Sequence, residues 1–249
     1  SPTRQYSSGE HYRVVFYNLE NLYDTLDAPY KGDDAFVPAG PRRWNAYKYH
    51  RKINGLFKVL VATGGWRPPA IVGVCEVENQ GVLDELIVKT PLSKYPYRVI
   101  HKDSPDPRGI DVAAIYHAHQ FEVFSFRYIQ TKWKNKALST RDILYLKGRL
   151  AGKDTLHLFF NHWPSKWKGA AKTQPKRKLA ARVVKHHVDS IFQREPTANI
   201  IAMGDFNDPP QASCLMEILR AKQPDPPHSA HALYNLCHHW NNEPVGTQK

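Results

Sequence analysis

The segment Asn199-Ile-Ile-Ala-Met-Gly-Asp-Phe-Asn-Asp208 joins an apolar strand pattern to a cluster of polar residues. Residues 199–203 are mostly apolar and partly β-branched, which predicts a buried strand. Gly204, Asp205 and Asn207 follow at once, before the breaker Pro209-Pro210. Taken alone, this polar end fits an Asx turn as well as a catalytic step in which Asp205 orients and deprotonates a water molecule. In the catalytic interpretation, Asn207 fixes the carboxylate or a phosphate oxygen.

The same succession of an apolar strand and polar residues recurs along the chain. Strands are also predicted over residues 12–17, 70–75, 111–116, 121–126 and 155–160. Asn18 follows the first of these, Glu76 the second, and Asn161 and His162 the fifth. Because strand ends meet at one rim of a sheet, we expect these side chains to lie close to Asp205. The recurrence, rather than any single residue, predicts an active site.

Helical patterns lie between the predicted strands. Apolar residues recur at helical spacing from Ile53 to Leu60, from Ala180 to Ile191 and, over a shorter stretch, from Leu215 to Leu219. The strands are mostly apolar on both faces, as in the inner strands of covered sheets. We find no repeat or linker, and a chain of 249 residues is long enough for one large core. The pattern predicts one α/β domain over residues 1–249, with two packed sheets flanked by helices.

Positive charge is concentrated in two segments without acidic residues. The chain has a net charge of +12, and residues 35–75 and 155–188 contain no Asp or Glu. Such segments favour a polyanionic partner, since clustered cations displace the counterions of a phosphate backbone. A solvated basic surface gives the same pattern. Trp163 and Trp167 lie in the second segment, where they either stack on bases or pack beneath a loop.

The polar residues at the strand ends have chemistry suited to a phosphoester. Glu76 is either a solvated carboxylate or a hard oxygen ligand of the kind that Mg²⁺ and Mn²⁺ bind. Asn18 either caps a turn or supplies a neutral oxygen ligand. His162 is either structural or a donor to a phosphoryl oxygen as charge develops. The three cysteines have no paired spacing and indicate neither a disulfide framework nor a zinc site.

Five motifs together resemble those of the endonuclease/exonuclease/phosphatase superfamily, which includes deoxyribonuclease I, and they occur in the family's order. They are Val15-Phe-Tyr-Asn-Leu-Glu-Asn21, Val72-Gly-Val-Cys-Glu-Val-Glu-Asn79, Arg108-Gly-Ile-Asp-Val-Ala-Ala-Ile-Tyr116, Asn161-His-Trp-Pro-Ser165 and Gly204-Asp-Phe-Asn-Asp208. The resemblance implies a four-layer α/β sandwich: two mixed β-sheets packed face to face, with helices outside and the site at one edge. It also implies a divalent metal, with Mg²⁺ expected and Mn²⁺ as the substitute.

The resemblance implies a role for each matching residue. Glu76 is expected to be the principal metal ligand, with Asn18 nearby. Asp205 is expected to be the water-activating base and Asn207 its positioning partner. The other implied roles are phosphate binding by His162, orientation of that histidine by Asp111, which is otherwise an edge carboxylate, and phosphate contacts by Arg108 and Asn161.

The sequence departs from the family pattern in its last part. Members carry a late Asp-His step whose histidine acts on the phosphoryl centre, and no Asp-His dipeptide follows Asp208. His238-His239 is the nearest substitute, but it lacks the preceding carboxylate. The expectation is therefore a domain that is incomplete at its C-terminal end, through truncation rather than natural loss, and that turns over weakly.

The function expected from the sequence is Mg²⁺-dependent hydrolysis of a phosphodiester, with DNA or RNA as substrate. Two alternatives stay open: a lipid or inositol-phosphate phosphatase or phosphodiesterase, and a non-catalytic nucleic-acid-binding relative. We expect a monomer, and no apolar run reaches the roughly 20 residues of a membrane span. The compartment stays open: the protein is either secreted or periplasmic after removal of a signal peptide, or it is cytoplasmic.

Overall fold

The fold is described from a computed structural model that covers residues 11–28, 31–65, 68–134, 136–167, 169–225 and 229–239. Two four-stranded sheets form its centre. The first has the order β1 (Val14–Leu22), β2 (Ile71–Val77), β4 (Asp111–His117), β3 (Tyr97–Ile100). The second has the order β10 (Asn199–Asp205), β9 (Thr155–His162), β8 (Ile143–Leu150), β5 (Phe121–Ile129). A small ribbon pairs β6 (Lys132–Trp133) with β7 (Lys136–Ala137).

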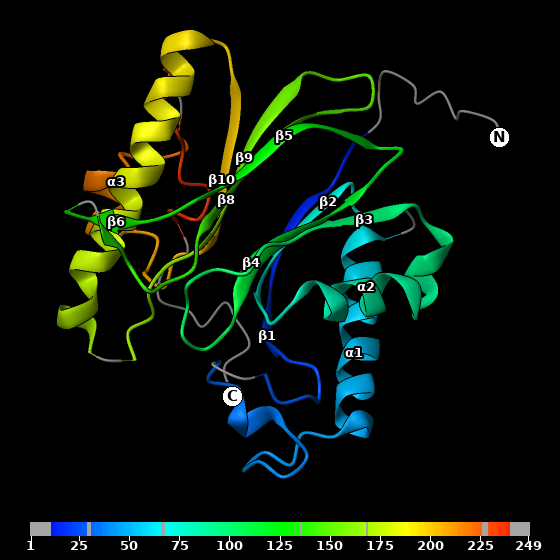
Figure 1. The fold of residues 1–249 in the computed structure, drawn as a ribbon. Helices are drawn as coiled ribbons and strands as arrows, with labels where there is room; N and C mark the ends of the chain where they lie inside the picture. Colours follow the sequence, from blue (N-terminus) through cyan, green and yellow to red (C-terminus); the bar gives the residue numbers. More distant parts are fainter. Residues whose placement is uncertain are drawn as a thin grey trace.

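Helices cover the outer face of each sheet, as Figure 1 shows. α1 (Ala46–Gly64) and α2 (Gln80–Val88) lie beside the first sheet, and α3 (Ala170–Arg194) lies beside the second. The short helices are η1 (Asp34–Phe36), η2 (Pro91–Lys94) and η3 (Cys214–Ile218). One apolar cluster lies between the sheets, and two others lie under the helices. The arrangement confirms the predicted four-layer sandwich. In the part of the chain described, no helix has the length and apolar character that a membrane span needs.

Two parallel strand pairs bring the predicted site residues to one edge. β1 runs parallel to β2, with Asn18 opposite Cys75, and β10 runs parallel to β9, with Asp205 opposite His162. β10 contacts both β1 and β2 across the interface between the sheets. Because parallel strands end at the same edge, their C-terminal residues face one another across the two sheets.

The structure extends and corrects the predicted elements. The site residues Glu76, His162 and Asp205 are the last or next-to-last residues of their strands and do not lie beyond them, and Asn18 lies in the middle of β1. Two strands of the main sheets, β3 and β8, the short ribbon of β6 and β7, and the helix α2 were not predicted. The prediction that the strands are inner strands is wrong for β1, β5 and β10, which lie at the edges of their sheets. In β5 the Phe124 and Phe126 side chains are also exposed. The last predicted helix is a single π-helical turn, η3.

Candidate active site

Four polar side chains from four strands meet between the two sheets. Asn18 Nδ2 donates to Asp205 Oδ2 at 3.2 Å. His162 Nε2 lies 3.7 Å from Glu76 Oε1 and 3.9 Å from Asp205 Oδ2. Asn18 and Glu76 are 58 positions apart in the sequence and His162 and Asp205 are 43 positions apart, so only the fold brings the four residues together. The predicted convergence of Asn18, Glu76, His162 and Asp205 is therefore present in the structure.

A strand irregularity directs Glu76 toward this group. The pairing of β2 with β4 shifts between Cys75 and Val77, and Glu76 between them adopts φ 60°. A positive φ is unfavourable for a residue with a Cβ atom and is found where neighbouring structure enforces it. Here the Asn21 backbone N–H donates to Glu76 Oε2 at 3.0 Å. The second carboxylate oxygen, Oε1, is the one that faces His162.

His162 is buried, and its burial favours the neutral imidazole. Its side chain is 2% exposed, and among the described residues its Nδ1 has no hydrogen-bond partner. Burial lowers the pKa of His162 well below its ordinary value, and the positive charges of Arg141 and Arg108 lower it further. A neutral imidazole keeps one N–H, so His162 can donate a single hydrogen bond without carrying charge.

Asp205 combines both roles that the sequence left open. Its Oδ1 accepts the Asn207 backbone N–H at 2.9 Å, which is an Asx turn. Its Oδ2 faces Asn18 and His162 in the site. The Asn207 side chain donates to the Trp163 carbonyl at 2.9 Å. Asn207 thus positions Asp205 through its backbone and the end of β9 through its side chain.

In the Asn161–Ser165 motif, the structure contradicts the phosphate contact expected of Asn161 and agrees with the packing alternative for Trp163. Asn161 is completely buried, its Nδ2 donates to the carbonyls of Phe159 and Met203, and its Oδ1 accepts Trp163 Nε1. With every amide hydrogen bond used inside the protein, Asn161 cannot bind phosphate. Trp163 is 1% exposed and packs edge-on against Phe206, which excludes it from base stacking. Trp167, by contrast, is 93% exposed.

Asp111 does not contact His162, as the predicted orienting role requires. Its Oδ2 lies 3.1 Å from His101 Nε2, and its Oδ1 accepts the Ser104 backbone N–H at 2.7 Å. Ligand atoms of His101, Asp103 and Asp111 lie within 4.8 Å of one another, a grouping that can hold a cation. The more direct effect of Asp111 is to fix the connection between β3 and β4, which carries Arg108.

Arg108 keeps the exposure that a phosphate contact requires. Its side chain is 44% exposed, and its positive charge acts on His162. Arg141 was missed by sequence reasoning, although it is buried and its charge acts more strongly on His162 than that of Arg108. The sequence signal was a charged residue two positions before an apolar strand, which is too common a pattern to identify Arg141.

The oxygen atoms at the site suit a hard divalent cation. Glu76 has a side chain that is 14% exposed, and Asp205 one that is 33% exposed, so both carboxylates are reachable from solvent. Asn18 Oδ1 accepts the Glu20 backbone N–H at 2.8 Å and retains a second lone pair. Carboxylate and amide oxygens are the usual protein ligands of Mg²⁺. These three residues therefore fit the metal that the resemblance implies.

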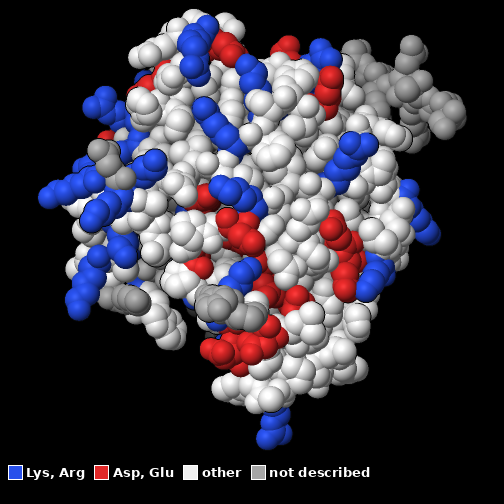
Figure 2. All heavy atoms as spheres, viewed as in Figure 1, with Lys and Arg blue, Asp and Glu red and all other residues white. Residues whose placement is uncertain are grey.

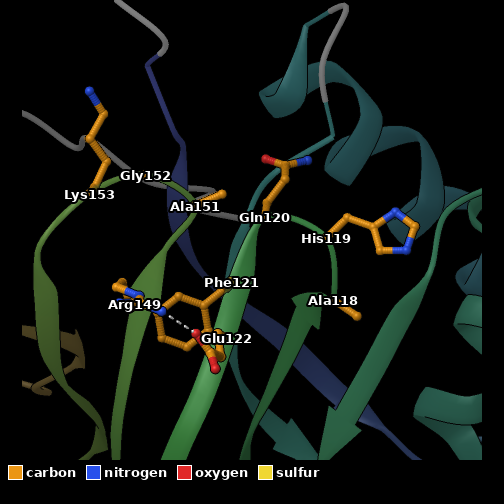
Figure 3. A pocket seen from close by; sticks show the side chains of 9 residues that line it. All are labelled: Ala118, His119, Gln120, Phe121, Glu122, Arg149, Ala151, Gly152 and Lys153. Atoms are coloured by element: carbon orange, nitrogen blue, oxygen red, sulfur yellow. Dashed lines mark hydrogen bonds and ion pairs between the residues drawn. The ribbon is translucent and has the colours of Figure 1, made fainter. Parts of the chain in front are cut away.

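Charge is distributed unevenly over the face shown in Figure 2, where Lys and Arg gather on the side of α3 and acidic residues gather in the middle. The exposed Lys and Arg residues of α3 are Lys172, Lys176, Arg182 and Arg194. A separate pocket of about 480 Å³ lies between the start of β5 and the end of β8, with residues of the two adjoining turns. In Figure 3 its Arg149 and Glu122 pair with each other, while Lys153 points away from them.

Comparisons with known proteins agree with this fold. A crystal structure of humanized D. rerio TDP2 has a TM-score of 0.53 and 14% identity, covering 82% of this chain and 65% of that one. The human Nocturnin catalytic domain gives a TM-score of 0.52 and 14% identity over 68% of this chain and 60% of its own. ANGEL2, a 2',3'-cyclic phosphatase, has a TM-score of 0.52 and 12% identity, covering 73% of this chain and 55% of its own. This chain thus spans less than two thirds of each relative's length.

The family assignment comes from the sequence. A search of curated protein sequences finds no significant match. The sequence model of the endonuclease/exonuclease/phosphatase family, however, matches residues 13–249, which is nearly the whole chain. The match includes all four residues that meet at the site. The chain therefore belongs to the endonuclease/exonuclease/phosphatase family.

Proposed function

We propose that this protein is a divalent-metal-dependent phosphodiesterase that cleaves nucleic acid. The observation that carries the proposal is the meeting of Asn18, Glu76, His162 and Asp205 from four strands of two sheets, with separations of 3.2 to 3.9 Å. Two carboxylates, an amide and a neutral histidine form the set of groups that hydrolysis of a phosphodiester by an activated water requires.

Each side chain has a distinct role in the proposed reaction. Glu76, Asn18 and Asp205 would hold Mg²⁺, or Mn²⁺ in its place. When bound, the ion neutralises charge on the phosphoryl oxygens. Asp205 accepts the proton of the attacking water, and its orientation is fixed by Asn18 on one oxygen and by the Asn207 backbone on the other. His162 donates its N–H to a phosphoryl oxygen as negative charge develops there.

The surface favours a nucleic acid over a small phosphate ester. The exposed Trp167 lies in the connection from β9 to α3, in sequence between His162 and the exposed lysines Lys172 and Lys176. Cations along a groove bind the backbone of a single strand, and an exposed aromatic ring stacks on its bases. A D. rerio TDP2 crystal structure with a TM-score of 0.51 and 15% identity contains a single-strand DNA product. That relative supports the choice of substrate class.

Cleavage of fluorescently labelled single-stranded DNA and RNA tests the proposal. Cleavage is expected with Mg²⁺, none with EDTA, and none in Glu76→Gln or Asp205→Ala. Asp205→Ala should still bind the strand, which separates an enzyme from a non-catalytic binder. Absence of cleavage by the wild-type protein on DNA, RNA and bis(4-nitrophenyl) phosphate refutes the proposed function.

The dependence on salt separates a nucleic acid from a small substrate. Affinity for an oligonucleotide falls steeply with salt, because each neutralised phosphate releases counterions, whereas affinity for an inositol phosphate changes little. The double variant Lys172→Ala/Lys176→Ala should weaken oligonucleotide binding and reduce that slope without changing turnover of bis(4-nitrophenyl) phosphate. Lys94→Ala on η2 is the matched control, since it removes an exposed lysine from the other half of the molecule.

A further inference from the structure

Arg141 is a buried cation that joins two separate parts of the protein. It lies just before β8, and its side chain is 5% exposed. Nη1 donates to Asp106 Oδ2 at 2.9 Å, and Nη2 donates to the Trp163 carbonyl at 2.8 Å. The first contact is to the connection between β3 and β4, and the second is to the residue directly after His162.

The contact with Asp106 leads to Arg108. The other oxygen of Asp106, Oδ1, accepts the Arg108 backbone N–H at 3.0 Å and lies 3.6 Å from Arg108 Nε. On the far side, the Arg108 carbonyl accepts the hydroxyl of Tyr23 at 2.8 Å. The backbone of Arg108 is thus held at both its N–H and its carbonyl, while its guanidinium stays at the surface.

The contact with Trp163 leads to the reacting groups. The Trp163 carbonyl also accepts the Asn207 side chain, and the Trp163 N–H donates to the Asp205 carbonyl at 2.9 Å. Trp163 therefore lies between His162 along the chain and Asp205 across the strand pair. One guanidinium fork connects this segment to the loop of Arg108.

We propose that Arg141 is a positioning residue that, through Asp106, sets the guanidinium of Arg108 at the distance from His162 and Asp205 where it binds a phosphate of the substrate. The proposal rests on the phosphodiesterase function proposed above. A lysine cannot replace Arg141, because a single ammonium does not present two planar N–H groups in a fixed fork. Charge alone at this position is therefore insufficient.

The competing explanation is that the Arg141–Asp106 ion pair serves only stability. A buried pair often contributes little net stability, although removing one partner is strongly destabilising. Stability alone predicts lower resistance to unfolding in variants, with KM unchanged in the protein that remains folded. Positioning of Arg108 predicts a change in KM, and it also predicts that this change disappears when Arg108 is absent.

A double-mutant cycle on bis(4-nitrophenyl) phosphate distinguishes the two. Arg108→Ala is expected to raise KM about tenfold or more, the effect of one charge-assisted hydrogen bond. Asp106→Asn and Arg141→Lys are expected to raise KM similarly, with a smaller change in kcat. Adding either of them to Arg108→Ala is expected to raise KM no further. Arg149→Lys is the control, since Arg149 is a half-exposed arginine paired with Glu122 at the opposite end of the molecule.

Several outcomes overturn the proposal. One is a KM of the Arg141→Lys variant equal to that of the wild type. Another is a KM of the double variant Asp106→Asn/Arg108→Ala that is raised by the product of the two single effects. If Asp106→Asn does not fold, the cycle of Arg141→Lys with Arg108→Ala gives the same test. If the wild-type protein binds the diester without cleaving it, the proposed function fails, and the dissociation constants from calorimetry replace KM in the cycle. Equal affinity in all variants then overturns the positioning role as well.

Discussion

Replacing Gly204 with alanine should damage both the fold and the site, because at this glycine β10 leaves no room for a Cβ atom beside the backbone of β9. In the parallel register, Gly204 is opposite Asn161. A Cβ atom on Gly204 would lie 2.1 Å from the Asn161 carbonyl oxygen and 2.7 Å from its carbonyl carbon and amide nitrogen. An ordinary C···O contact is about 3.3 Å, so the strands would have to separate by about 1 Å.

The clash cannot be relieved by a side-chain rotation, since all three atoms belong to the backbone. Overpacking of this kind costs typically 1–3 kcal/mol, and we expect about 3 kcal/mol here. For a chain of this size that lowers Tm by roughly 6–12 °C. The pair next to Gly204 and Asn161 is Asp205 and His162. A displacement of about 1 Å at reacting groups costs on the order of 100-fold in rate, so kcat/KM should fall by at least that factor.

Thermal unfolding and turnover of bis(4-nitrophenyl) phosphate measure the two effects. Gly55→Ala in α1 is the control, because a Cβ atom there meets nothing within 4 Å. It should raise stability by about 0.5–1 kcal/mol, the helix preference for alanine over glycine, and leave turnover unchanged. A Gly204→Ala protein with the Tm and turnover of wild type would refute the close approach and its role in aligning the site.

Three further predictions follow from single contacts. Asp205→Asn should lower kcat on bis(4-nitrophenyl) phosphate by about 10² to 10⁴ with little change in Tm, since it removes the base and keeps the shape; an unchanged kcat would exclude Asp205 as the base. Asn161→Leu should lower the free energy of unfolding in urea by about 1–3 kcal/mol, because Trp163 Nε1 loses its partner. If Asn161→Leu instead raised KM at unchanged stability, Asn161 would be a phosphate ligand after all. Burial lowers the pKa of His157 below its ordinary value of 6.5, so below about that pH the unfolded chain binds more protons and stability falls with the pH. In His157→Gln that fall should be smaller, and an equal fall would assign it to other groups.

The layers of the fold were predictable from the sequence because buried strands and amphipathic helices carry strong apolar patterns. β8 was not predicted because its second half, Lys147-Gly-Arg-Leu150, is polar in sequence. In the fold, Lys147 pairs with Glu195 and the strand packs on both faces. α2 was not predicted because it is short and lies in sequence between the site residues Glu76 and Asp111. Its capping residue, Asn79, belongs to the motif that was interpreted as part of the active site.

Side-chain alternation explains which site residues were predictable. Neighbouring residues of a strand point to opposite faces. Phe160 packs between the sheets and Phe159 under α3, so His162 must face the interface between the sheets and Asn161 must face away. Phe16 and Met203 also pack toward that interface, which sends Asn18 and Asp205 to the same side. The misassignment of Asn161 was therefore avoidable, because its neighbour His162 already occupied the reactive face.

The Glu76 side chain points to the face opposite to the one that strand alternation predicts, and no pattern in the sequence indicates this direction. Cys75 packs between the sheets, while Val74 and Val77 pack against the cluster under α1 and α2. Strict alternation would direct Glu76 toward the helices and Val77 toward the other sheet. The register shift between Cys75 and Val77, with φ 60° at Glu76, reverses both. A bulge therefore turns the Glu76 side chain toward the proposed metal site. The position of this bulge depends on the pairing of β2 with β4, which exists only in the folded sheet.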